Sequence, residues 1–289
     1  MSNKDLLENI KKLRELTGVG FKDCKNAIDE NGGDIEKSIE FLRKKGIAKA
    51  SKRMGRTAAE GVVCINEKDN EFSIIEINSE TDFVAKNNDF INFVKELSEI
   101  NLVSNSDVDK IKEFKMKNSE SVENNLVSII AKIGEKITIG RSKTISHNNS
   151  INFSYLHTVV KDNLCKLAVV VSLETNETNE KINIFGKQLA MHIAASNPLA
   201  IDIDGIDQKI IDKELEIIKA EIINSGKPKE IAEKISKGKI ARFINDNTLL
   251  NQIWIMDPKK KVSDILKENK IDNEIKVLDF IRYKVGEGV

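Results

Sequence analysis

The feature that most constrains this fold is an apolar run that passes through a short polar turn into a segment with helical spacing. Residues 72–77 form the run, which is rich in residue types that favour β-strands. Residues 79–87 form the turn. The following segment carries apolar side chains spaced as on one helix face: Phe90, Phe93, Val94, Leu97 and Ile100. The pattern predicts a strand, a turn and a helix in succession, and loops held between such elements often carry function.

The turn, SETDFVAKN in one-letter code, permits two interpretations. Ser79 and Asp82 have the spacing of a capping box. In this interpretation Ser79 or Thr81 caps a helix, and Phe83 lies in the core. In the other interpretation, Asp82 and Phe83 face outward as a contact site. Aromatic residues make up only 5% of the chain, so an exposed Phe83 would be a notable use of a scarce residue type.

Residues 1–46 predict three short helices separated by glycine-containing breaks. A bundle of this size has a small core and is marginally stable alone. The first break contains Gly18, Val19, Gly20 and Phe21. It is either a candidate contact site or a plain turn between helices.

The third helix is expected to end at Gly46, and residues 47–60 then form a basic linker. Basic runs can bind nucleic acid, but four positive side chains without an interleaved aromatic residue favour a solvated tether. The chain carries 46 Lys and Arg against 46 Asp and Glu, so no net field draws it to nucleic acid or to an anionic membrane. We therefore expect no direct nucleic-acid partner.

Beyond the linker, strand and helix patterns predict an α+β fold with helices on antiparallel sheets. Strand–strand–helix occurs twice, which indicates two related subdomains. The first copy has strands near 62–65, 72–77 and 136–145, with helices near 90–100, 107–117 and 121–133. The second has strands near 153–160, 167–173, 253–256 and 275–283, with helices at 179–194 and 262–268.

An antiparallel helical hairpin interrupts the second copy. Residues 207–243 carry two apolar stripes on either side of a turn at 224–228. Such a hairpin serves either self-association or a merely rigid projection, and the sequence leaves both open. The predicted domains are 1–55 (three-helix module and linker), 56–146 (first subdomain), 147–200 with 248–289 (second subdomain), and 201–247 (coiled-coil hairpin).

The sequence favours a cytoplasmic protein. No apolar run approaches the roughly 18 residues that a membrane span needs, and the first residues do not resemble a signal peptide. Cys24, Cys64 and Cys165 are odd in number and far apart, which suits reduced thiols better than a disulfide framework or a zinc site. We expect neither a membrane nor a metal partner.

The common motifs of catalysis are missing from the sequence. It holds no phosphate-binding glycine loop, no dinucleotide fingerprint, no His-Glu-x-x-His and no Cys-x-x-Cys. Of the three histidines, His192 lies within a predicted helix and is expected to be buried or to cap it, and His147 is expected to lie between a strand and a loop. His157, near the end of a strand, is the candidate for a partner contact. We expect no catalytic residue and no cofactor.

Six separated motifs, in order, carry a resemblance to bacterial elongation factor Ts over essentially the whole length. They are LRELTGVG at 13–20 with DCK at 23–25, TDFVAKN at 81–87, VSIIAKIGE at 127–135, MHIAAS at 191–196, SGKPKEIAEK at 225–234 and VGEG at 285–288. The resemblance implies a ubiquitin-associated-like N-terminal module, two strand–helix subdomains and an inserted coiled-coil hairpin. These agree with the elements predicted from the residues.

The resemblance also implies guanine-nucleotide exchange on elongation factor Tu, a GTPase that holds GDP with Mg²⁺. In the family, the turn matching Thr81, Asp82, Phe83 and Val84 presses between helices of the GTPase domain and disturbs its Mg²⁺ site. The N-terminal module would contact the GTPase domain. The second subdomain, around His157, would contact another domain of the partner.

An alternative function is a binding adaptor without exchange activity. Such an adaptor would use the three-helix module and the hairpin to recruit other proteins. A catalyst with an unrecognised site is a third possibility. A measurement of GDP release from elongation factor Tu distinguishes these three functions.

Overall fold

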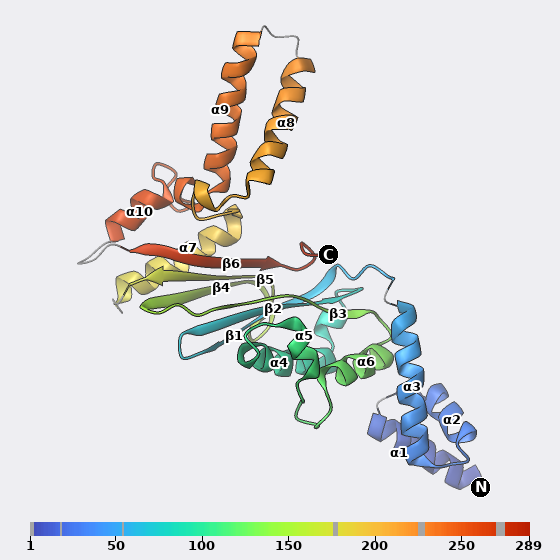
Figure 1. Cartoon of the computed structure of the whole chain (residues 1–289). Helices are drawn as coiled ribbons and strands as arrows, with labels where there is room; N and C mark the ends of the chain where they lie inside the picture. The colour runs from blue at the N-terminus through green and yellow to red at the C-terminus, as the bar shows by residue number, and fades with distance from the viewer. Residues whose placement is uncertain (1–2, 18, 54, 176–178, 225–228, 270–274) are drawn as a thin grey trace. The chain divides into compact units, whose positions relative to one another are not determined.

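The computed structural model describes residues 3–17, 19–53, 55–175, 179–224, 229–269 and 275–289 (Figure 1). By its contacts the chain forms two units. The first comprises Met1–Thr144, Leu156–Leu167 and Tyr283–Val289, and the second Ile145–Tyr155 and Ala168–Arg282. Both helices and strands are abundant, so the predicted α+β class is confirmed. The finer division at residues 55, 146, 200 and 247 stays a prediction.

The elements follow one another in the expected succession. From the N-terminus they are α1 (Asn3–Thr17), α2 (Phe21–Glu30), α3 (Ile35–Arg53), β1 (Glu60–Lys68), β2 (Glu71–Ser79), η1 (Val84–Lys86), α4 (Asn88–Val103), α5 (Val108–Glu113), α6 (Val122–Ile133) and β3 (Ile137–Ile145). Then come β4 (Ser150–Lys161), β5 (Leu164–Glu174), α7 (Glu180–Ser196), η2 (Ile203–Gly205), α8 (Gln208–Asn224), α9 (Lys229–Asn247), η3 (Leu249–Asn251), α10 (Val262–Asn269) and β6 (Lys276–Lys284).

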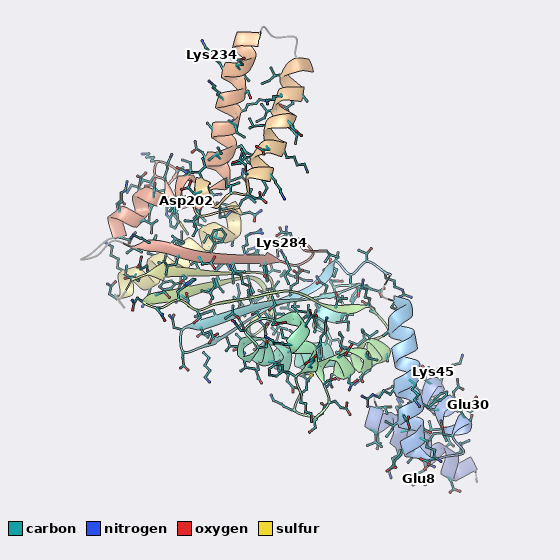
Figure 2. All side chains as sticks on the ribbon, in the orientation of Figure 1. Glu8, Glu30, Lys45, Asp202, Lys234 and Lys284 are labelled. Carbon is teal, nitrogen blue, oxygen red and sulfur yellow. The ribbon has the colours of Figure 1, made fainter. Side chains whose placement is uncertain are left out.

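Helices α1, α2 and α3 form a small bundle around an apolar core of their own. Its buried side chains are Ile10, Leu13, Cys24, Ala27, Ile28 and Leu42. Charged side chains such as Glu8 and Glu30 remain exposed (Figure 2). Asp34 caps the start of α3 by accepting a hydrogen bond from the Lys37 amide at 3.0 Å. The predicted three-helix module is present.

Helix α3 continues past Gly46, where we expected it to end. Gly46 is buried, and a Cβ built on it would lie 3.4 Å from the Ala131 side chain of α6. Near the end of α3, Arg53 donates a hydrogen bond to the Ile130 carbonyl at 2.8 Å. Packing on α6 therefore stabilises a helix that local sequence would stop. The predicted helix end was wrong, and the first part of the basic linker is helical.

The sheet of the first unit is built on an antiparallel pair. Strands β1 and β2 pair from Glu60 opposite Ser79 to Lys68 opposite Glu71, and Asp69 and Asn70 make the connection with positive φ of 50° and 65°. Strand β3 lies beside β2, and β5 lies beside β1. This arrangement brings the end of β2 next to the start of β3.

Helices α4 and α6 contribute the apolar layer that packs with this sheet. The core includes Ile75, Ile77, Phe90, Val94, Leu97, Ile111, Ile129, Ile130 and Ile137. Helix α5 ends at Glu113, so the predicted helix to residue 117 was too long. Phe114 adopts extended backbone angles, and Lys115 then bridges to Ser121. A local antiparallel bridge thus replaces the last predicted turn of that helix.

A buried ion pair holds the C-terminal stretch on this sheet. Glu76 on β2 is 1% exposed and pairs with Arg141 on β3 at 2.7 Å. Its other oxygen accepts hydrogen bonds from the Asn78 amide group and the Gly286 backbone N–H, both at 2.8 Å. Arg141 also donates to the Lys284 carbonyl at 2.9 Å. Because a buried carboxylate is tolerated only when paired and hydrogen-bonded, these contacts specify where the VGEG motif lies.

In the second unit, α7 packs against strand β4. The buried face of α7 carries Ile182, Phe185, Leu189 and Ile193. Gly186 permits a close approach, because a Cβ there would lie 2.3 Å from the Phe153 ring on β4. Helices α8 and α9 lie side by side, as the predicted hairpin requires (Figure 1). Residues 225–228, the expected hairpin turn, lie outside the described part of the chain.

Residues 253–256 do not form the predicted strand. Ile253 makes a single bridge to Lys261, and the chain then turns at Ile255 and Met256. Trp254 is 3% exposed and stacks on His192 with ring centroids 5.1 Å apart. One buried aromatic anchor between exposed neighbours gives the same alternation as a strand, which explains the wrong prediction.

None of the helices in the described ranges combines the length and apolar character that crossing a membrane would require.

We predict that all three thiols react slowly in the folded protein. Cys24, Cys64 and Cys165 are buried, and burial raises the pKa of Cys64 to about 11 and that of Cys165 to about 12. Because the thiolate is the reactive form, an aromatic disulfide reagent near pH 8 should label them far more slowly in buffer than in urea. Rapid labelling of Cys64 or Cys165 in the folded protein would contradict their burial.

We also predict that His192 makes the second unit less stable at mildly acidic pH. His192 is fully buried, and burial lowers its pKa below the ordinary 6.5, while the hydrogen bond of its ring Nε2 to the Gln252 side-chain oxygen opposes this shift. As pH falls through about 6.5, the unfolded chain gains a proton that the folded chain resists, so the free energy of unfolding decreases. Fluorescence of Trp254, which stacks on His192, reports urea unfolding at pH 7.5 and about pH 5.5.

The matched variant is His192→Gln, which is neutral at both pH values. Its urea midpoint should depend less on pH in this range than the midpoint of the unsubstituted chain. Equal pH dependence would assign the effect to other groups.

Candidate functional site

The turn between β2 and α4 presents an aromatic ring to solvent. Phe83 is 76% exposed, the largest value among the exposed large apolar side chains of the described residues. The next two side chains point the other way, since Val84 is 3% and Ala85 1% exposed and both belong to the core. Of the two interpretations of this turn, the outward-facing Phe83 is confirmed and the core Phe83 is wrong.

The capping expected at Ser79 or Thr81 is absent from the described turn. The 3₁₀ turn η1 intervenes, and α4 begins only at Asn88. Asn87 is its cap, accepting hydrogen bonds from the amides of Asp89 at 2.9 Å and Phe90 at 3.3 Å. The Ser79 hydroxyl instead donates to the Thr81 carbonyl at 2.9 Å. The capping-box prediction failed because burial of Val84 and Ala85 inserts one tight turn before the helix.

Two glutamates tie the base of the turn to the loop between α6 and β3. The Glu135 carboxylate accepts hydrogen bonds from the Thr81 backbone N–H at 3.0 Å and from the Thr81 hydroxyl at 2.8 Å. In the opposite direction, Glu80 accepts one from the Lys136 backbone N–H at 2.6 Å. Gly134, with φ of 91°, ends α6 and turns the chain so that Glu135 follows at once. Each carboxylate therefore binds the backbone of the other segment.

A further charge supports Glu80. The Arg56 guanidinium donates to both oxygens of the Glu80 carboxylate at 3.2 Å, and the Lys136 ammonium donates to the Arg56 carbonyl at 2.8 Å. The Lys136 amide, and after it Arg56, hold the pKa of Glu80 below its ordinary value. The carboxylate therefore remains charged at neutral pH, which strengthens its hydrogen bonds.

Asp82 lies at the outer side of the turn. Its carboxylate is 3.9 Å from the Lys86 ammonium, and both side chains are more than half exposed. Exposed pairs of this kind contribute about 0–1 kcal/mol. Asp82 can therefore exchange Lys86 for a polar group of a partner at little cost.

The first break of the N-terminal module presents a second ring. Gly18 lies outside the described residues. Val19 is half-buried against the helical core. The Gly20 carbonyl accepts hydrogen bonds from the amides of Asp23 and Cys24, so Gly20 is the N-cap residue of α2. Phe21 is 47% exposed at the first position of that helix.

The three histidines differ in environment. His192 is buried, which is one of the two alternatives that the sequence left open, and His147 is exposed. His157 is exposed on β4, in the part of that strand that belongs to the first unit. The next residue, Thr158, has φ of 54°, and Val159 is 55% exposed, so this strand end offers both apolar and polar surface.

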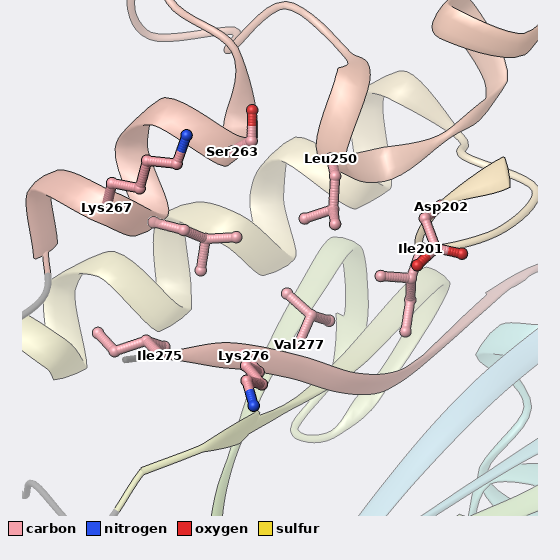
Figure 3. Close-up of a pocket in the computed structure, with 9 residues that line it drawn as sticks. Ile201, Asp202, Leu250, Ser263, Lys267, Ile275, Lys276 and Val277 are labelled. Carbon is pink, nitrogen blue, oxygen red and sulfur yellow. The ribbon is translucent and has the colours of Figure 1, made fainter. Parts of the chain in front are cut away.

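A pocket of about 400 Å³ lies apart from these residues, in the second unit (Figure 3). Its lining includes Ser263 and Lys267 from α10, and Lys276 and Val277 from β6. None of the residues that the sequence singled out lines it. Within the described ranges, no group of three or more His, Cys, Asp or Glu side chains gathers as a metal site would require.

Sequence reasoning identified the turn but assigned no role to Glu80, Glu135 or Lys136. The motif VSIIAKIGE ends at Glu135, and this was the available signal. Only the tertiary structure shows that it reaches Thr81, which lies 54 residues earlier in the chain.

The comparisons with known proteins agree on one family. The family model described as "Elongation factor TS" matches residues 80–287. Over 282 residues the chain is 41% identical to elongation factor Ts of Nitrobacter hamburgensis, covering 97% of this chain and 92% of that protein. Elongation factor Ts of Rickettsia typhi is 39% identical over 283 residues, covering 97% of this chain and 91% of that protein. The chain therefore belongs to the elongation factor Ts family of translation elongation factors.

Proposed function

We propose that this chain is a guanine-nucleotide exchange factor for elongation factor Tu and promotes the release of GDP so that GTP can bind. It acts by protein–protein contact and not as an enzyme with its own reactive site, and as a translation factor it works in the cytoplasm. Exposure of Phe83 on a turn anchored at both ends is the observation that carries the proposal. An exposed aromatic ring on a fixed support is what a partner-binding anchor needs.

The proposed mechanism uses the sensitivity of a Mg²⁺ site to geometry. Mg²⁺ demands near-ideal octahedral coordination at about 2.0–2.1 Å, and in the partner it neutralises phosphate charge. The Phe83 ring inserts between helices of the GTPase domain and displaces the groups that support the ion. Asp82 redirects polar groups around the ring, and buried Val84 supports the turn from below. Weaker Mg²⁺ binding then weakens GDP binding.

The remaining proposed contacts are those that the resemblance to the family implies. Phe21, with Val19 and Gly20, contacts the GTPase domain, and the exposed Phe21 ring supports this role. His157 contacts a different domain of elongation factor Tu. Helices α8 and α9 provide a surface for self-association. Size-exclusion chromatography of the chain with and without residues 201–247 tests the last of these.

We predict that Phe83→Ala leaves stability nearly unchanged. Because the ring is 76% exposed, its removal creates no cavity. The matched variant is Phe90→Ala, whose ring is fully buried and whose loss should reduce the free energy of unfolding by about 3–5 kcal/mol. Thermal melting of both variants checks this. A large loss of stability in Phe83→Ala would place the ring in the core.

We predict that Phe83→Ala strongly slows GDP release from elongation factor Tu, and that Asp82→Ala does so to a smaller degree. Coupling between two ligands is reciprocal, so the unsubstituted chain must weaken GDP and Mg²⁺ binding by the partner, and GDP with Mg²⁺ must weaken binding of the chain. Stopped-flow release of fluorescent GDP, with and without Mg²⁺, measures both effects. Binding of the unsubstituted chain without faster release would instead support a non-exchanging adaptor.

A further inference from the structure

The two sides of Phe83 are held by different forces. On its C-terminal side, Val84 and Ala85 are buried in the apolar core. On its N-terminal side, Asp82 is exposed and Thr81 is half-buried, so burial fixes the backbone there only weakly. The hydrogen bonds of Thr81 therefore decide whether this side of the turn keeps its conformation.

Glu135 makes the long-range contacts of Thr81. Its two oxygens accept from the backbone N–H at 3.0 Å and from the hydroxyl at 2.8 Å, and both bonds are charge-assisted. The bond from the Ser79 hydroxyl to the Thr81 carbonyl joins Thr81 only to the end of β2, two residues earlier, and not to the segment that carries Glu135. The hydrogen bond from the Lys136 amide to Glu80 holds the chain just after β2, but it acts on the residue before Thr81 and not on Thr81 itself.

We infer that Glu135 is a positioning residue for Phe83. It holds the turn rigid, so that when the ring meets the partner, groups of the partner move and the ring stays in place. This inference rests on the proposed exchange function. A ring on a loose turn can move aside when it meets the partner, so the complex forms without strain at the nucleotide site. Functional groups act on a partner only as far as their supporting contacts hold them in place.

This role predicts a particular kinetic signature. Loss of Glu135 should reduce the maximal rate of GDP release at saturating concentrations of the chain, because that rate depends on displacement within the complex. The concentration that gives half the maximal rate should change little, because most of the binding surface is intact. We expect a fall of about tenfold in the maximal rate and less than about threefold change in half-saturation.

Glu135→Gln is the primary variant. The amide keeps the size of the side chain but loses its charge, and it has a single acceptor oxygen for the two donors of Thr81. Glu113→Gln is the matched control, since Glu113 is an exposed glutamate on α5 of the same unit. The control should exchange nucleotide like the unsubstituted chain.

Thr81→Val is the second variant, for the case that Glu135→Gln lowers the melting temperature enough to obscure kinetics. It removes the hydroxyl donor, preserves side-chain shape and leaves the Glu135 charge in place. It should also reduce the maximal rate more than half-saturation. Thr81→Ser, which retains the hydroxyl, should lose less of the maximal rate than Thr81→Val.

The double variant Glu135→Gln with Phe83→Ala separates positioning from general stabilisation. If Glu135 acts through the ring, the double variant should release GDP no more slowly than Phe83→Ala alone, because the ring that Glu135 positions is gone. A residue that only stabilises the fold would add its loss to that of Phe83→Ala.

Three results would overturn the inference: unchanged maximal rates in both Glu135→Gln and Thr81→Val, losses confined to half-saturation, or additive losses in the double variant. These results are distinct from failure of the proposed function. If the unsubstituted chain does not accelerate GDP release, the exchange function fails, and the inference fails with it. If it does so and depends on Phe83, only the role of Glu135 is at stake.

Discussion

Packing of the apolar faces of α4 and α6 with the β1–β2 pair positions both the turn that carries Phe83 and the loop that carries Glu135. Phe90, Val94 and Leu97 fix α4, and with it the end of the turn that carries Phe83. Ile129 and Ile130 fix α6, and with it the loop that carries Glu135. Because both helices share one core with β2, segments far apart in the sequence meet where β2 ends. Hydrogen bonds between the segments then refine a position that burial has already set.

Polar groups act in this unit where apolar packing cannot specify a unique arrangement. Glu76, buried on β2, pairs with Arg141 and accepts hydrogen bonds from the Asn78 side chain and the Gly286 backbone N–H. The last of these bonds holds the VGEG motif on the sheet. A buried ion pair is weak evidence for added stability, but removal of one partner leaves an uncompensated charge and is strongly destabilising. The Glu80 and Glu135 carboxylates act similarly at the half-buried rim. In both clusters a carboxylate accepts backbone N–H groups and so fixes chain position.

The exposed ring of Phe83 separates stability from the proposed function among neighbouring residues. Val84 and Ala85 supply burial, Asn87 caps the following helix, and Phe83 supplies almost no burial. A site whose functional side chain contributes little to folding can be altered without loss of the fold. Because of this separation, the proposed exchange activity and the thermal stability can be measured independently of each other.

The local spacing of apolar residues was enough to predict most helices and strands, because this spacing depends on which face of each element is buried. It predicted the three-helix module, the hairpin, the two strand–helix copies and the turn at Thr81–Val84, and six motifs carried the family. It could not choose between a core and an exposed Phe83, since both fit the same spacing. It also misplaced the end of α3 at Gly46 and took residues 253–256 for a strand. Those outcomes depend on contacts with α6, with His192 and with the core beneath Val84, which join residues distant in sequence. For the same reason, only the tertiary structure brought Glu135 to Thr81.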